Sequence, residues 1–248
     1  MILTLHPPCI GAETADCLRH LAASNPEIKQ FCFAAITRPT PLQERFNLCP
    51  SEAKIVDDAL QTRAETHLPF WDALHLMSFG SGNVSERLLA QARFHQSNVD
   101  KEEWLDASRV VDGELSQRCL DHVGPTMLSV LSEVKLKNGS RGHFVFIDFH
   151  IPVSPENAGI VSKVANQLLS YPAFIIESGA SYHLIGTEVV DAAEFRRALI
   201  TALLFGPITD RAYIAHQLLE GKAALRYSKG GHFDMIPKLV RISSPLPG

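Results

Sequence analysis

One stretch, residues 142–183, constrains the fold of this chain more than any other. It contains the apolar run Phe144–Ile147, then Asp148, an amphipathic segment at 155–170 and a second apolar run, Ala173–Ile176. Short apolar runs bounded by polar residues are typical of buried strands, whereas residues 155–170 carry apolar side chains at helical spacing. The pattern predicts a strand, a helix and a second strand that share one sheet.

Polar side chains with useful chemistry lie where these strands end or begin. Asp148 and His150 follow the first strand, and Ser181 and His183 follow the turn after the second. Because alternate residues of a strand face the same side, we expect Asp148 to face with His150, and Ser181 with His183. Two such pairs at the edges of apolar strands favour a functional site over a simple core.

The pattern beyond this unit predicts the rest of the sheet. A strand at 183–186, a helix at 191–205 and a last strand at 223–228 would complete a split, ferredoxin-like arrangement. The predicted fold class is therefore α+β, with an RRM-like core.

The length of 248 residues allows two closely packed subdomains. We expect an N-terminal α/β module at residues 1–125 and the RRM-like core at 126–248. An Asn-Gly dipeptide at 138–139 predicts a hairpin at the start of the core. Within the first module, the acidic segment Glu102–Trp104 is expected to be helical.

Composition excludes several classes of protein. The net charge of −4 argues against a protein that coats nucleic acid through bulk charge. The five cysteines are odd in number and lack the spacing of zinc ligands, so reduced thiols are expected. No apolar run approaches the roughly 20 residues that span a membrane, and the N-terminal residues do not resemble a signal peptide. We expect a cytoplasmic protein without membrane contact.

Two carboxylates are candidates for holding a metal ion. Asp148 and Asp210, with His150 near the first, offer the ligands that Mg²⁺ or Mn²⁺ would use beside substrate phosphates. The alternative is that Asp148 caps backbone groups and that His150 is an ordinary residue at a strand edge. Spacing alone leaves both interpretations open.

A second group of residues is suited to phosphate. Ser181 and His183, at the rim of the neighbouring strand, could each donate a hydrogen bond to a phosphate oxygen. Arg226 and Lys229 follow a predicted strand and suit the same task, although a solvated basic turn explains them equally well. A catalytic Ser-His dyad is disfavoured, because side chains two residues apart on a strand are parallel and about 7 Å apart.

These motifs, in this order, resemble those of the archaeo-eukaryotic primase superfamily. The matching segments are Ile-Asp-Phe-His at 147–150, Ser-Gly-Ala-Ser-Tyr-His at 178–183, an apolar-Asp motif ending at Asp210, and Leu-Arg-Tyr-Ser-Lys at 225–229. The resemblance covers roughly residues 126–241 and points to a divergent bacterial branch of primase-polymerases. His150 stands where the family has a second carboxylate.

The resemblance implies a primase-type nucleotidyltransferase. Asp148, Asp210 and His150 would then be catalytic and hold Mg²⁺ or Mn²⁺, and Ser181, His183, Arg226 and Lys229 would bind the nucleotide. Expected partners are a nucleoside triphosphate, single-stranded or template-primer DNA or RNA, and other proteins. Two alternatives stay open: a catalytically degenerate primase fold that binds nucleotide or nucleic acid within a larger assembly, and a metal-dependent hydrolase.

Overall fold

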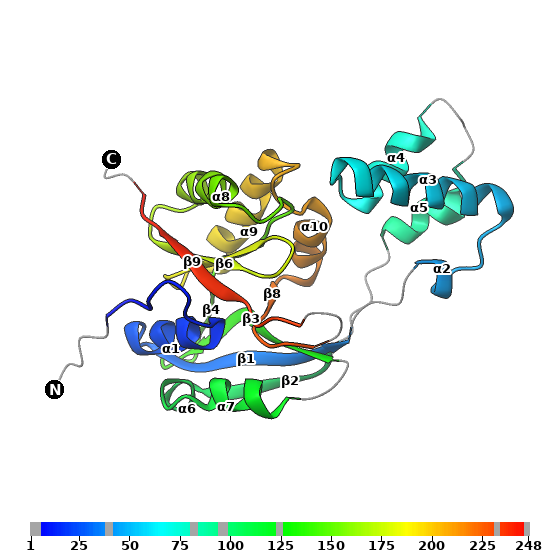
Figure 1. The fold of residues 1–248 in the computed structure, drawn as a ribbon. Helices are drawn as coiled ribbons and strands as arrows, with labels where there is room; N and C mark the ends of the chain where they lie inside the picture. Colours follow the sequence, from blue (N-terminus) through cyan, green and yellow to red (C-terminus); the bar gives the residue numbers. More distant parts are fainter. Residues whose placement is uncertain are drawn as a thin grey trace. The chain divides into compact units, whose positions relative to one another are not determined.

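The computed structural model describes residues 6–37, 42–79, 84–93, 99–122, 126–230 and 234–245. Contacts divide the chain into two compact units (Figure 1). Met1–Thr37 and Val99–Gly248 form the first, here called the sheet unit, and Arg38–Asn98 form the second, the helical unit. This division differs from the expected boundary between residues 125 and 126. That boundary would separate strand β1 (Ile28–Thr37) from strand β3 (Thr126–Leu136), which pair along their lengths.

A five-stranded antiparallel sheet forms one layer of the sheet unit. Strand β2 (Val99–Asp106) pairs with β1, and β1 pairs with β3. The other edge of β3 is shared by β4 (Arg141–His143) and β8 (Ala224–Arg226). The expected helix at Glu102–Trp104 is wrong, because these residues belong to β2. Pairing with β1 buries Leu105 and leaves the next residue, Asp106, exposed, as expected where neighbouring residues of a strand face opposite sides.

A four-stranded antiparallel sheet forms the second layer and carries Asp148 and His183. Its order is β5 (Phe146–Asp148), β7 (Tyr182–Gly186), β6 (Ala173–Glu177) and β9 (Lys238–Ser243). Helix α8 (Pro155–Leu168) connects β5 to β6 and packs against β6, β7 and β9. Helix α9 (Ala192–Ala202) follows β7 and contacts α8. The structure thus confirms an α+β fold and the predicted order from β5 to α9.

The closing strand of this sheet is not the one that the sequence suggested. The strand predicted at 223–228 exists as β8, but it pairs with β3 in the other sheet. Strand β9 takes the fourth place, next to β6, whereas a ferredoxin-like sheet would place its last strand beside the first. The free edge of β5 is instead met by residues 208–210, through a bridge between Phe149 and Thr209.

One hydrophobic core joins the two sheets. Aromatic rings link them directly: Phe31 of β1 stacks on Phe144 at 6.0 Å between ring centroids, and Phe144 stacks on Phe146 of β5 at 6.5 Å. Three helices contribute buried residues to the same core: α1 (Thr14–Ser24), α6 (Ala107–Val111) and α7 (Glu114–Asp121). The motif-bearing strands therefore stand on a continuous packed support.

The helical unit has its own core. It contains α2 (Leu42–Arg45), α3 (Pro50–Thr66), α4 (Phe70–Ser78) and α5 (Glu86–Ala92). Val56 and Ala59 of α3 pack with Leu74 of α4 and Leu88 of α5, and all four are fully buried. The unit is inserted between the paired strands β1 and β2. In the part of the chain that the structure describes, no helix is long and apolar enough to cross a membrane.

Candidate functional site

The first two motifs meet through strand pairing. Asp148 is the last residue of β5, and the ladder between β5 and β7 places it opposite His183. His183 Nε2 lies 3.7 Å from Asp148 Oδ1. Residues 35 positions apart in the sequence thus share one point on the sheet.

The third motif reaches the same point through the backbone. The Asp210 amide donates a hydrogen bond of 2.9 Å to the Asp148 carbonyl. The Asp210 carboxylate caps helix α10 (Arg211–Glu220) by accepting the Tyr213 amide at 2.9 Å. The structure therefore brings Asp148, His183 and Asp210 together.

The Asp148 carboxyl is in an unfavourable environment for its negative charge. Its side chain is only 30 % exposed, and this burial, followed by the charge of Asp210, raises the pKa of Asp148 well above its ordinary value. The Phe149 amide and the guanidinium of Arg226 act in the opposite direction without cancelling the rise. Two carboxyl groups thus share a partly desolvated site, where the ionisation of both is unfavourable.

His183 is neutral and buried. Its expected position at the rim of a strand is wrong, because β7 lies between β5 and β6 and the residue is 8 % exposed. Burial, with a smaller effect of Arg226, lowers the pKa of His183 to about 3. The imidazole Nδ1 is buried and has no hydrogen-bond partner among the described residues.

Arg226 and Lys229 differ although they are three residues apart. Arg226 is 7 % exposed and donates hydrogen bonds to the backbone carbonyls of Ser178, Ser228 and Met235 at 2.5, 2.5 and 2.8 Å. Burial lowers its pKa to about 10 while Asp148 opposes the shift, so the guanidinium remains charged at neutral pH. Lys229 is exposed to solvent. Of the two, only Lys229 stands in solvent, where a ligand could meet it without displacing backbone contacts.

Ser181 and His150 are connected through the backbone. The Ser181 hydroxyl donates to the Phe149 carbonyl at 2.7 Å and accepts the Ile151 amide at 3.1 Å. The amide of His150, between them, donates to the Ile208 carbonyl at 2.7 Å. The His150 side chain is partly buried.

Asp148 and Asp210 are the donors that a metal ion could use at this site. Within the residues that the structure describes, no three His, Cys, Asp or Glu side chains are grouped to hold one. His150 therefore does not complete a three-donor set with Asp148 and Asp210. The two carboxylates alone still fit Mg²⁺ or Mn²⁺, because such ions often take one or two carboxylates and fill the remaining positions with water and phosphate oxygens. A cation would also relieve the repulsion that raises the pKa of Asp148.

Tyr213, which follows the third motif, is a further residue of the site. Tyr213, in the first turn of α10, donates its hydroxyl to the Ala224 carbonyl at 3.0 Å. Burial and the charges of Asp148 and Asp210 raise its pKa well above the ordinary value, and its amide donates to the Asp210 carboxylate. The signal in the sequence was its position three residues after Asp210, in a context that resembles the tail after the third motif of primase-polymerases.

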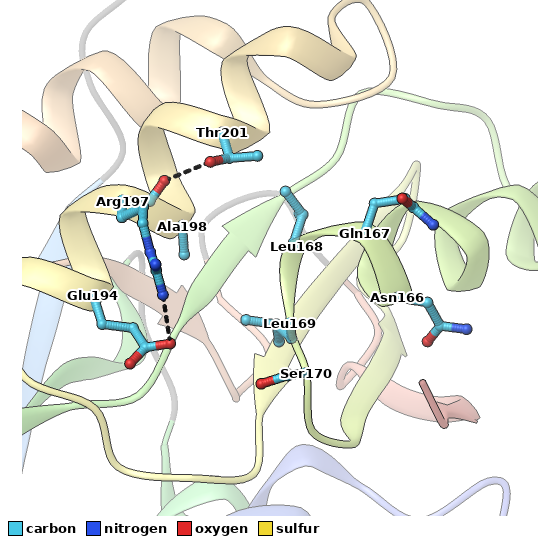
Figure 2. A pocket seen from close by; sticks show the side chains of 9 residues that line it. All are labelled: Asn166, Gln167, Leu168, Leu169, Ser170, Glu194, Arg197, Ala198 and Thr201. Carbon is cyan, nitrogen blue, oxygen red and sulfur yellow. Dashed lines mark hydrogen bonds and ion pairs between the residues drawn. The ribbon is translucent and has the colours of Figure 1, made fainter. Parts of the chain in front are cut away.

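A separate pocket lies away from these residues. Its volume is about 350 Å³, and it is formed by the last turn of α8 and by α9 (Figure 2). Arg197 on its wall contacts Glu194 at 3.1 Å, and Thr201 donates to the Arg197 carbonyl at 2.8 Å. None of the motif residues lines this pocket.

Comparison with known proteins now defines the class of this chain. The family model described as AEP-like, archaeo-eukaryotic primase 1D-like, matches residues 109–233, half of the chain. The chain belongs to this family, within the archaeo-eukaryotic primase superfamily. The match contains every motif residue from Asp148 to Lys229 and excludes the helical unit. No curated protein and no solved structure matches the chain.

Proposed function

We propose that this protein is a primase-type nucleotidyltransferase that acts on a nucleoside triphosphate and nucleic acid with a divalent metal ion. The observation that carries the proposal is the convergence of three distant motifs, in which Asp148 lies beside both His183 and Asp210. Membership of the primase family suggests nucleotidyl transfer as the reaction at this site. The fold class alone would not suggest a reaction.

Asp148 and Asp210 are the residues proposed to hold Mg²⁺ or Mn²⁺. When bound, the metal would supply Lewis-acid stabilisation for the charge that develops during phosphoryl transfer. The carboxylates also define where the α-phosphate must approach. His150 contributes an imidazole close by in the chain rather than the second carboxylate that the family usually has.

His183, Lys229 and Arg226 are the residues proposed to act on the triphosphate. Neutral His183 can donate one hydrogen bond without adding charge, since its pKa is about 3. Lys229 provides an exposed point charge, and buried Arg226 provides a fixed positive field beside Asp148. With a net charge of −4, the chain must hold nucleic acid through such local contacts.

The test is nucleotide incorporation by the full chain. Purified protein is mixed with a labelled nucleoside triphosphate, Mg²⁺ or Mn²⁺, and either single-stranded or template-primer DNA or RNA. The proposal expects extended product and pyrophosphate, both abolished by Asp210→Asn. Triphosphate binding without product would instead favour a degenerate binding protein, and cleavage of nucleic acid without triphosphate would favour a metal-dependent hydrolase.

A further inference from the structure

The Ser181 hydroxyl continues a strand ladder beyond the point where the strand ends. The ladder between β5 and β7 pairs Asp148 with His183, and the Phe149 amide then donates to the Tyr182 carbonyl at 2.9 Å. Beyond this point, the next carbonyl and the amide of Ile151 are bonded by the side chain of Ser181. The Ser181 hydroxyl therefore replaces the backbone groups with which a partner strand would bond Phe149 and Ile151.

This arrangement fixes the residue that lies between the two hydrogen bonds. The bonds of Ser181 bracket His150, whose amide is held from the opposite edge by the Ile208 carbonyl. The peptide groups that flank His150 are thus bonded on both edges. We therefore expect the alternation of β5 to continue to residue 150, which would place its imidazole on the face that carries Asp148.

Ser181 is itself held in place by a tight turn. Its carbonyl accepts the Ser178 amide at 2.9 Å and the Ser178 hydroxyl at 3.2 Å. The Ser178 carbonyl in turn accepts Arg226 Nη2. The turn at 178–181 is therefore a rigid base from which one hydroxyl can position another segment.

The hydrogen-bonding capacity of a hydroxyl decides between positioning and phosphate binding. A serine hydroxyl has one hydrogen, and Ser181 donates it to the Phe149 carbonyl. Ionised phosphate oxygens accept hydrogen bonds, so a bond from Ser181 to phosphate would leave the carbonyl without this donor. The family resemblance suggests the phosphate role, but the contacts point elsewhere.

We propose that Ser181 is a positioning residue, which sets the direction of His150 beside Asp148 and does not bind the triphosphate. The proposal rests on the proposed function for its catalytic meaning, but the positioning itself exists in the free protein. It can therefore be measured without substrate.

The first experiment is amide hydrogen exchange by NMR on the full chain without ligand. In Ser181→Ala, the Ile151 amide loses its acceptor and should exchange about fivefold faster or more. Ser181→Thr keeps the hydroxyl and should restore slow exchange. Ser178→Ala is the matched control, because its hydroxyl donates to a carbonyl that already has the Ser178 amide. An unchanged Ile151 exchange rate in Ser181→Ala would overturn the proposal.

The second experiment separates the two roles by function. Calorimetry with a nucleoside triphosphate should give the same Kd for Ser181→Ala and the native chain. If Ser181 bound the phosphate, the substitution would instead weaken triphosphate binding about tenfold. In the incorporation assay, Ser181→Ala should lower kcat at constant KM, and should have no further effect in a His150→Ala background. Additive losses, or a raised KM in both backgrounds, would contradict positioning. If the chain proves to have no transferase activity, the exchange and calorimetry results still decide the role of Ser181.

Discussion

Asp148 in the sheet unit and Glu52 in the helical unit are both carboxylates withdrawn from water, yet their environments shift the pKa in opposite directions. Glu52, 2 % exposed, accepts hydrogen bonds from the Ser85 hydroxyl, the Cys49 amide at 2.9 Å and Arg87 Nη2 at 2.8 Å. These donors lower its pKa to about 2. Asp148 has fewer compensating donors and a carboxylate neighbour, and its pKa rises.

The difference separates a structural carboxylate from one that is suited to a ligand. A buried charge with enough donors stabilises the fold, because every oxygen is already satisfied. A buried carboxyl beside a second one makes the empty protein less stable and leaves a place for a cation. The same residue chemistry therefore supports architecture in one unit and function in the other.

The largest expected effect is the loss of activity in Asp148→Asn. The amide keeps the shape of the side chain but cannot hold a divalent cation, so nucleotide incorporation should fall by about 100-fold or more. The melting temperature should stay the same or rise, because a repelling charge has been removed. Incorporation assays and calorimetric melting measure the two effects, with exposed Glu156→Gln as the control. A large fall in melting temperature would mean that Asp148 is structural, like Glu52.

The opposite outcome is expected for Glu52→Gln. Loss of the charge weakens three hydrogen bonds at once and should lower the stability of the helical unit by about 2 kcal/mol. Urea unfolding followed by the fluorescence of Trp71, in a Trp104→Phe background, measures this change. The control is Glu65→Gln on the same helix, where the exposed carboxylate accepts one bond from Gln61. Equal effects of the two substitutions would remove the contrast.

The pH dependence of the helical unit should follow from the lowered pKa of Glu52. The unfolded chain takes up the proton near the ordinary value of 4.5, whereas the folded chain resists it until about pH 2. The stability contributed by Glu52 is thus present above about pH 4.5 and is lost as the pH falls towards 2. The same fluorescence assay should show a shallower acid dependence for Glu52→Gln. Identical pH profiles would show that other carboxylates govern acid unfolding.

Much of the local fold could be predicted from sequence because apolar periodicity reports local structure. Strand β6, helix α8 and helix α9 lie close to their predicted ranges, and the Asn-Gly turn joins β3 to β4. Sheet membership could not be predicted for β8, because its pairing with β3 depends on residues about 95 positions away. Strand β2 was missed because its acidic residues have low strand propensity, and pairing with β1 outweighs that preference.

The site was predictable as a set of positions but not as a set of contacts. The motifs predicted Asp148 with Asp210 as metal ligands and His183 with Ser181 as phosphate ligands, and in the fold Asp148, His183 and Asp210 are neighbours. The burial of Arg226 and the backbone bonds of Ser181 depend on where the turn at 178–181 lies, which no local pattern reveals. Glu52 had no signal either, since two of its donors, Ser85 and Arg87, come from another helix.

Position 150 gives the smallest expected effect and a direct test of the contrast between Asp148 and Glu52. A carboxylate can be added there, close to Asp148 and Asp210, which have few donors to offset their charge. In His150→Asp, strand alternation places a third negative charge near Asp148 and Asp210, so the metal-free protein should melt at a lower temperature. A divalent cation would offset that repulsion, and we expect Mg²⁺ to bind about tenfold more tightly and to restore the melting temperature. His150→Asn is the matched control, since it has the same shape without the charge. Calorimetric titration with Mg²⁺ and with Mn²⁺ measures the change. Equal metal affinity in the two variants would place residue 150 outside the metal's reach and would favour a nucleotide-binding protein without turnover.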